Sequence, residues 1–203
     1  PPHFAHQGIT IDDALTFSVG FLGPKLSELY IAYAQHLSEN DALDHRYVGE
    51  GLNADSAGFN VAVDAVQALR DQLEQSLNTP AFSEWLAAFF TDPASEDMAH
   101  DSELEDTLSL TAFTKELQVA GGLTKPAYVK FALIPSPAPS SGGTYHLGVN
   151  GQTFGVNDDA LSVVLSLMKE DAVSTQGAPE LLDHLELLCA LYNHEALEFV
   201  DAA

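Results

Sequence analysis

The sequence predicts an α+β protein in which a helical segment is followed by a smaller module of helices and strands. Apolar residues recur at helical spacing in three stretches, 25–37, 60–77 and 80–91. Ala14–Phe21 alternates like a strand, and Asn150-Gly151 separates two apolar runs, which is a strong signal for a two-residue hairpin turn. Helix, strand, hairpin and helices then follow in an order typical of a winged-helix-like module.

The three early helices have clear boundaries. Pro24 precedes the first, and Pro80 both ends the second and suits the first turn of the third. The third helix also contains Trp85 among several phenylalanines. Aromatic residues this dense at helical spacing are typical of a protein core or an oligomer interface rather than of a cofactor site.

A change of composition separates the two parts of the chain. Residues 91–102 are polar and acidic, which indicates a domain boundary. After it we expect a helix at 114–120 that ends at Gly121-Gly122, a strand at Ala127–Ile134 and a loop at Pro135–Gly143. The other expected elements are hairpin strands at 146–149 and 152–156, helices near 158–168 and 179–191, and a strand at 196–200.

Acidic residues dominate the composition. The 203 residues include 30 Asp and Glu against 7 Lys and Arg, for a net charge of −23. The excess is even, since residues 1–100 contribute 3 − 15 = −12 and residues 101–203 contribute 4 − 15 = −11. This charge argues against direct nucleic-acid binding and favours a basic protein partner or a salty habitat. No apolar run is long enough to predict a membrane span.

Cys189 is the single cysteine, and it lies in an apolar run. One cysteine excludes an internal disulfide and fits a reducing compartment such as the cytoplasm. Together with the lack of a predicted membrane span, this leads us to expect a soluble protein. The surrounding leucines predict that the Cys189 side chain is buried.

Motifs for catalysis are sparse. The one His-x-Glu pair is His184-Leu185-Glu186, in a predicted helix, where side chains two residues apart diverge and cannot share a metal ion. The sequence also contains no Gly-x-Ser-x-Gly, no phosphate-binding glycine loop and no Cys-x-x-Cys. Apart from any family resemblance, the residues predict no complete active site.

Residues 1–37 resemble the end of the cupin/JmjC domain of bacterial ribosomal oxygenases, which hydroxylate an arginine of a ribosomal protein. The matching residues are Pro1, Pro2, Phe4, His6, Gln7, Gly8, Asp12, Asp13 and Ser18-Val19-Gly20-Phe21. The remainder is similar in the order of its elements, with a tryptophan in the last helix of the helical region and an Asn-Gly hairpin further on. The resemblance therefore rests mainly on the first 37 residues.

The resemblance implies a role for two residues in an iron(II)- and 2-oxoglutarate-dependent reaction. His6 corresponds to the second iron-binding histidine, and Ser18 to a residue on the last barrel strand that contacts 2-oxoglutarate. The His-x-Asp pair of such a site has no counterpart in these 203 residues, so the chain alone is expected to be inactive. The implied organisation is the end of a double-stranded β-helix at 1–23, a helical homodimerisation domain at 24–100 and a winged-helix-like domain at 101–203.

Two other interpretations stay open. One is a non-catalytic, acidic, dimeric protein-interaction module that associates through the aromatic helix. The other is an acidic soluble protein of unrelated function. If the chain belongs to a ribosomal oxygenase, the complete enzyme needs a basic ribosomal protein as its substrate, whereas an interaction module needs only a binding partner.

Overall fold

The computed structural model describes residues 23–40, 46, 61–93, 107–140, 143–170 and 172–200. The chain divides into two compact units, Pro1–Leu43 and Asp44–Ala203. The predicted strand at Ala14–Phe21 lies outside the described residues, as do His6 and Ser18. None of the described helices is long and apolar enough to cross a membrane.

The first unit contributes one described helix, α1 (Leu26–Glu39). The backbone N–H of Lys25 donates a 2.9 Å hydrogen bond to the Glu28 carboxylate, which satisfies one of the free donors at the start of the helix. At the other end, the Asn40 side chain donates to the carbonyl of His36 at 2.8 Å. The helix predicted after Pro24 is confirmed.

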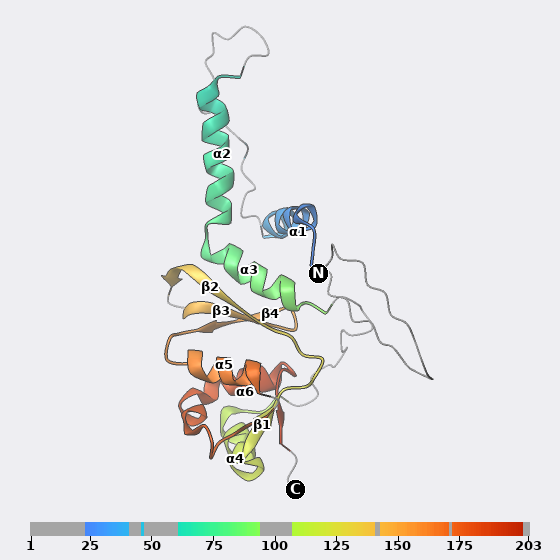
Figure 1. The fold of residues 1–203 in the computed structure, drawn as a ribbon, viewed down its shortest axis with the longest axis vertical. Helices are drawn as coiled ribbons and strands as arrows, with labels where there is room; N and C mark the ends of the chain where they lie inside the picture. Colours follow the sequence, from blue (N-terminus) through green and yellow to red (C-terminus); the bar gives the residue numbers. More distant parts are fainter. Residues whose placement is uncertain are drawn as a thin grey trace, which may run out of the picture. The chain divides into compact units, whose positions relative to one another are not determined.

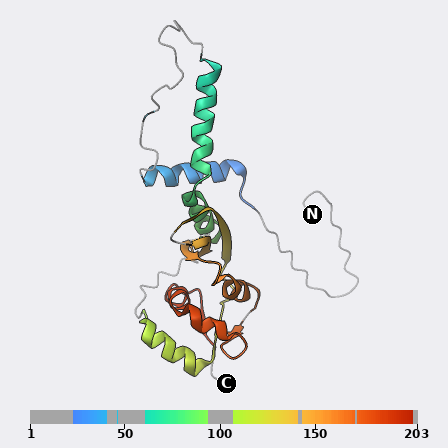
Figure 2. The same ribbon diagram turned by 90° about the vertical axis from the view of Figure 1, so that its left-hand side faces the viewer.

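Two helices begin the second unit, α2 (Val63–Leu77) and α3 (Pro80–Thr91). They meet at Asn78 and Thr79, where the chain changes direction (Figures 1 and 2). The Thr79 hydroxyl accepts a hydrogen bond from the N–H of Phe82 at 3.2 Å, and Pro80 occupies the first turn of α3. Both predicted helices are confirmed, because a threonine cap and a proline at the first position separate them.

In the described residues of the remainder of the unit, six strands form two antiparallel sheets. One sheet has the order β2-β3-β4, with β2 at Phe131–Ser140, β3 at Gly143–Val149 and β4 at Gln152–Val156. The other has the order β5-β1-β6, with β1 at Gly122–Thr124, β5 at Ala172–Ser174 and β6 at Glu198–Phe199. The helices of this part are α4 (Leu110–Ala120), α5 (Leu161–Lys169) and α6 (Leu185–Asn193), with a 3-10 helix, η1, at Pro179–His184.

The main core lies between one face of the β2-β3-β4 sheet and the elements α4, β1, α5 and α6 (Figure 1). Its fully buried side chains come from every one of these elements: Phe113, Leu117, Leu123, Leu147, Val149, Val156, Val163, Val164, Leu188 and Leu191. Cys189 is buried as predicted. This combination of helices and antiparallel strands confirms the predicted α+β class, whereas the predicted division at residue 100 stays a prediction.

The predicted hairpin is confirmed in detail. Asn150 and Gly151 both have positive φ angles, 49° and 76°, as a two-residue turn of this hand requires. Val149 pairs with Gln152 directly across the turn. The Asn-Gly dipeptide therefore fixes the register of β3 against β4.

The interpretation of Pro135–Gly143 as a loop is wrong, because β2 continues to Ser140. Among the described strands β2 lies at the edge of its sheet, and proline is tolerated at an edge because a missing N–H donor on the unpaired side breaks no ladder hydrogen bond. The regular pairing of β2 with β3 ends at Pro135, and the register shifts before Ser140. An edge position and an irregular register thus allow a strand where the number of prolines predicted a loop.

Candidate functional site

The residues predicted to bind iron and 2-oxoglutarate, His6 and Ser18, lie outside the described residues, so their roles stay predictions. Within the part of the chain that the structure describes, no group of three or more His, Cys, Asp or Glu could hold a metal ion. His184 ends η1 and Glu186 lies in the first turn of α6, so the helical setting expected for this pair is confirmed. The described residues therefore do not fit an iron site by themselves.

Helix α3 makes a close contact with the β2-β3-β4 sheet. Leu147 and Val149 of β3 face the core, so His146 and Gly148 face the opposite side. We call this side the outer face, and the strand register adds four residues to it: Ala132, Ile134, Thr153 and Gly155. α3 packs against β2, β3 and β4 (Figure 1).

Small side chains bring α3 close to the outer face. Ser83, Ala87 and Thr91 are four residues apart, so they share one side of α3, and all three are buried. A Cβ atom added at Gly148 would overlap the backbone of Ala87. Glycine at 148 is therefore required by the close approach of two backbones rather than by its φ angle.

Three hydrogen bonds tie the hairpin to its neighbours. The N–H of Gly151 donates to the Thr91 hydroxyl at 3.3 Å, and the Thr153 hydroxyl donates to the Glu84 carboxylate at 3.2 Å. On the other side, the Asn150 side chain donates to the carbonyl of His194 at 3.2 Å. The turn thus connects the end of α3 with the end of α6, and we call this region the turn junction: Thr91, Asn150, Gly151 and His194.

His146 is the buried polar residue of the outer face, with 8% of its surface exposed. Its Nε2 atom is buried and has no hydrogen-bond partner among the described residues. A buried nitrogen without a partner costs free energy, so His146 is a weak point of this interface.

Asn193, the last residue of α6, holds the segment that leads into α4. Its side chain accepts from the N–H of Leu108 at 2.9 Å and donates to the carbonyl of the same residue at 3.0 Å. Cys189 donates weakly to that carbonyl at 3.5 Å. Burial raises the pKa of the Cys189 thiol, and its hydrogen bond with Asn193 opposes this without reversing it. The thiol is therefore a poor nucleophile at neutral pH.

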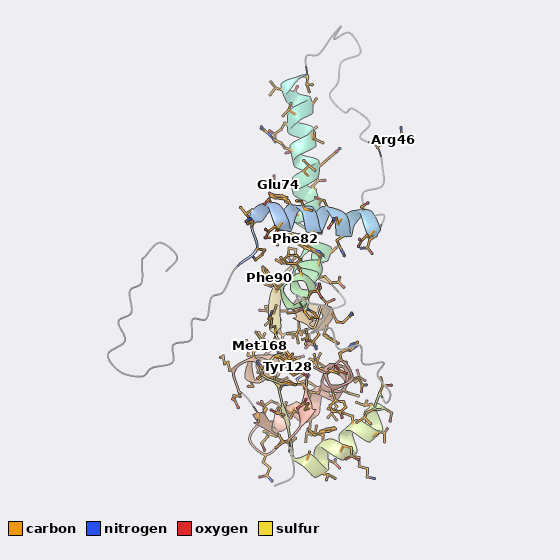
Figure 3. The ribbon with its side chains drawn as sticks, turned by 90° about the vertical axis from the view of Figure 1, so that its right-hand side faces the viewer. Arg46, Glu74, Phe82, Phe90, Tyr128 and Met168 are labelled. Carbon is orange, nitrogen blue, oxygen red and sulfur yellow. The ribbon has the colours of Figure 1, made fainter. Side chains whose placement is uncertain are left out.

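Tyr128, labelled in Figure 3, is 56% exposed. Partial burial raises the pKa of the Tyr128 phenol, and the carboxylates of Glu198 and Glu195 raise it further. Two carboxylates thus lie near this exposed tyrosine, in line with the acidic composition of the chain.

An apolar face of α2 is exposed. Val66, Leu69 and Leu73 follow one another at spacings of three and four, and Leu73 is 57% exposed. Val63 on the same side is 83% exposed. On α3, Trp85 is buried between Phe82 and Phe89, with ring centroids 5.7 and 5.1 Å away, whereas Phe90 is partly exposed (Figure 3).

Sequence reasoning missed the contact between α3 and the outer face. The signal was the spacing of Ser83, Ala87 and Thr91, three small residues on one side of a helix that is otherwise aromatic. Their partner, Gly148, could not be paired with them because 60 residues lie between Ala87 and Gly148.

Comparison with known proteins gives one curated relative and a set of solved structures, whereas no family model matches the chain. The chain is 25% identical over 92 residues to the ribosomal protein uL16 3-hydroxylase of Escherichia coli K12. That alignment covers 45% of this chain and 25% of the relative.

The fold is similar to that of YcfD, a ribosomal oxygenase from Escherichia coli. The TM-score is 0.64 at 19% identity over 89% of this chain and 48% of YcfD. A structure of YcfD in complex with cobalt and 2-oxoglutarate matches with the same TM-score at 18% identity. The predicted resemblance to ribosomal oxygenases is thereby confirmed, and the chain spans about half the length of these solved relatives.

Proposed function

We propose that this chain is part of an iron(II)- and 2-oxoglutarate-dependent oxygenase that hydroxylates an arginine side chain of a basic ribosomal protein in the cytoplasm. The observation that carries the proposal is the similarity in fold to a ribosomal oxygenase over 89% of the chain. The name of the curated relative, a uL16 hydroxylase, supports a ribosomal protein as the substrate.

His6 and Ser18 are the residues of this chain that we assign to the reaction. His6 would supply one imidazole ligand to iron, and Ser18 would hydrogen-bond 2-oxoglutarate. When bound, the metal and 2-oxoglutarate together supply the oxidising chemistry. Because iron in such sites needs two histidines and a carboxylate, these 203 residues alone are expected to be inactive.

The resemblance to ribosomal oxygenases also suggests roles for the other parts of the chain. Residues 1–23 would complete a barrel, residues 24–100 would form a homodimer, and residues 101–203 would form a winged-helix-like domain. The exposed apolar side chains of α2 support the dimer, since an apolar helix face of this kind is usually covered by a partner. The net charge of −23 supports long-range attraction of a basic ribosomal protein and argues against direct nucleic-acid binding.

The test is a hydroxylation assay with the protein that the complete gene encodes. Purified uL16 would be incubated with this protein, iron(II) and 2-oxoglutarate, and tryptic peptides would be weighed for the addition of an oxygen atom. We expect product with the wild-type protein and none with His6→Ala. His3→Ala is the matched control, since it removes a histidine of the same segment that has no assigned role, and it should keep its activity. Full activity of His6→Ala would contradict the assignment.

The second candidate function is a non-catalytic, acidic, dimeric interaction module, and the apolar face of α2 favours it as well. The hydroxylation assay distinguishes the two functions. If the complete protein dimerises and binds uL16 but does not hydroxylate it, the interaction module is supported and the oxygenase is not.

A further inference from the structure

We propose that Asn150-Gly151 is a site of spontaneous deamidation, and that the turn junction controls its rate. This inference goes beyond the proposed function and concerns a covalent change of the chain itself. Asn150 is the one asparagine of the sequence that is followed by glycine. Glycine has no side chain to hinder attack by its own backbone nitrogen, so this dipeptide is chemically the most reactive of the asparagine sites.

The reaction needs two groups of the turn to meet. The backbone nitrogen of Gly151 attacks Cγ of Asn150, and a new C–N bond closes a five-membered imide. The bond from Cγ to Nδ2 breaks, and Nδ2 leaves as ammonia with the proton from the Gly151 nitrogen. Water then opens the imide at one of its two carbonyl groups. The products are aspartate, or isoaspartate with an additional methylene group in the main chain.

In the folded chain, hydrogen bonds hold both reacting groups in other directions. The Gly151 N–H is directed to the Thr91 hydroxyl at 3.3 Å. The Asn150 amide is directed to the carbonyl of His194 at 3.2 Å. The positive φ angles of both residues fix the turn between them. Imide formation therefore requires the turn junction to open first.

Deamidation would make the opening permanent. An aspartate at 150 cannot donate to the carbonyl of His194, so two oxygen atoms would face each other where a hydrogen bond now lies. Isoaspartate would lengthen the turn by a methylene group, which no longer fits the pairing of Val149 with Gln152. Aspartate thus weakens the connection of the turn to the end of α6, and isoaspartate also disturbs the turn from which the Gly151 N–H donates to Thr91 of α3.

The experiment measures conversion of Asn150 in the 203-residue chain by peptide mapping at neutral pH. Thr91→Val removes the acceptor of the Gly151 N–H, whereas Thr91→Ser keeps a hydroxyl at the same position. Since one hydrogen bond favours the closed turn by a modest factor, we expect Thr91→Val to convert about two- to tenfold faster than wild type. Thr91→Ser should convert at the wild-type rate.

Ser109→Ala is the matched control, because it removes the hydroxyl that caps α4 and accepts from the Ala112 N–H at 3.3 Å, away from the turn. It should leave the rate unchanged. A wild-type rate for Thr91→Val would overturn the proposal. Equal acceleration by Ser109→Ala would also overturn it, since global unfolding rather than the turn junction would then set the rate. In urea all four chains should convert equally.

Discussion

Gly148 of β3 faces the backbone of Ala87 in α3 at a distance that leaves no room for a Cβ atom. Helix and strand backbones approach this closely only where side chains are minimal on both elements. The orientation of α3 on the sheet thus depends on a residue that lies in the middle of a strand, where glycine is otherwise unfavourable.

We expect Gly148→Ala to lower the free energy of unfolding by about 1–3 kcal/mol, because the added methyl group forces α3 away from the sheet. Urea unfolding measures this change. Gly177→Ala is the matched control, since the nearest atom to its added Cβ, the carbonyl oxygen of Ser174, lies at 3.8 Å. If both variants unfold at the same urea concentration, the close approach of Gly148 to the Ala87 backbone does not contribute to stability.

Trp85→Ala is expected to lower the free energy of unfolding by about 3–5 kcal/mol, because the ring is buried between Phe82 and Phe89. The same urea titration applies. Phe90→Ala, on the partly exposed side of the helix, should cost much less. A loss below about 1 kcal/mol for Trp85→Ala would mean that the indole is exposed in solution.

The proposed homodimer predicts that Leu73→Asp shifts the protein from dimer to monomer in light scattering coupled to size exclusion, because a carboxylate cannot be buried in an apolar contact without a partner. Val119→Asp is the matched control, as Val119 is exposed on α4 and lies outside the proposed dimer contact. A Leu73→Asp dimer at the same concentration would remove α2 from the dimer contact.

Cys189 should make stability depend on pH in alkaline solution. Burial raises the pKa of its thiol above the ordinary 9.0, so the unfolded chain loses this proton first as the pH rises. The folded chain binds the proton more tightly, and the stabilisation is present below pH 9.0 and declines above it. Urea titrations of wild type and Cys189→Ala should therefore converge or cross as the pH rises above this value. A constant difference would contradict the raised pKa.

Much of the fold could be predicted from local signals. Pro24, Pro80 and the apolar spacing between them located the early helices, and Asn150-Gly151 located the hairpin because only a few residues accept positive φ angles. β1 and β5 were missed, since three residues are too few to show a period of two. β2 was cut short because its prolines resemble a loop in the sequence and become compatible with a strand only at a sheet edge.

The candidate site was less predictable than the fold. The resemblance carried by residues 1–37 led to the ribosomal oxygenases, which the comparisons confirm, whereas the assignments of His6 and Ser18 stay predictions. The contacts of Gly148 and of the turn junction depend on residues far apart in the sequence. The spacing of small residues in α3 marks a helix face suited to close contact, but no local pattern identifies the partner of that face, which packing decides.

The alternating prolines of β2 have a consequence for how copies of this chain can meet. An exposed strand edge with free N–H groups is a template on which further strands can add, and such growth ends in aggregates. Pro135, Pro137 and Pro139 have no N–H to offer an incoming strand, and the register of β2 against β3 shifts between Pro135 and Ser140. Both features make this part of β2 a poor template for the addition of a further strand.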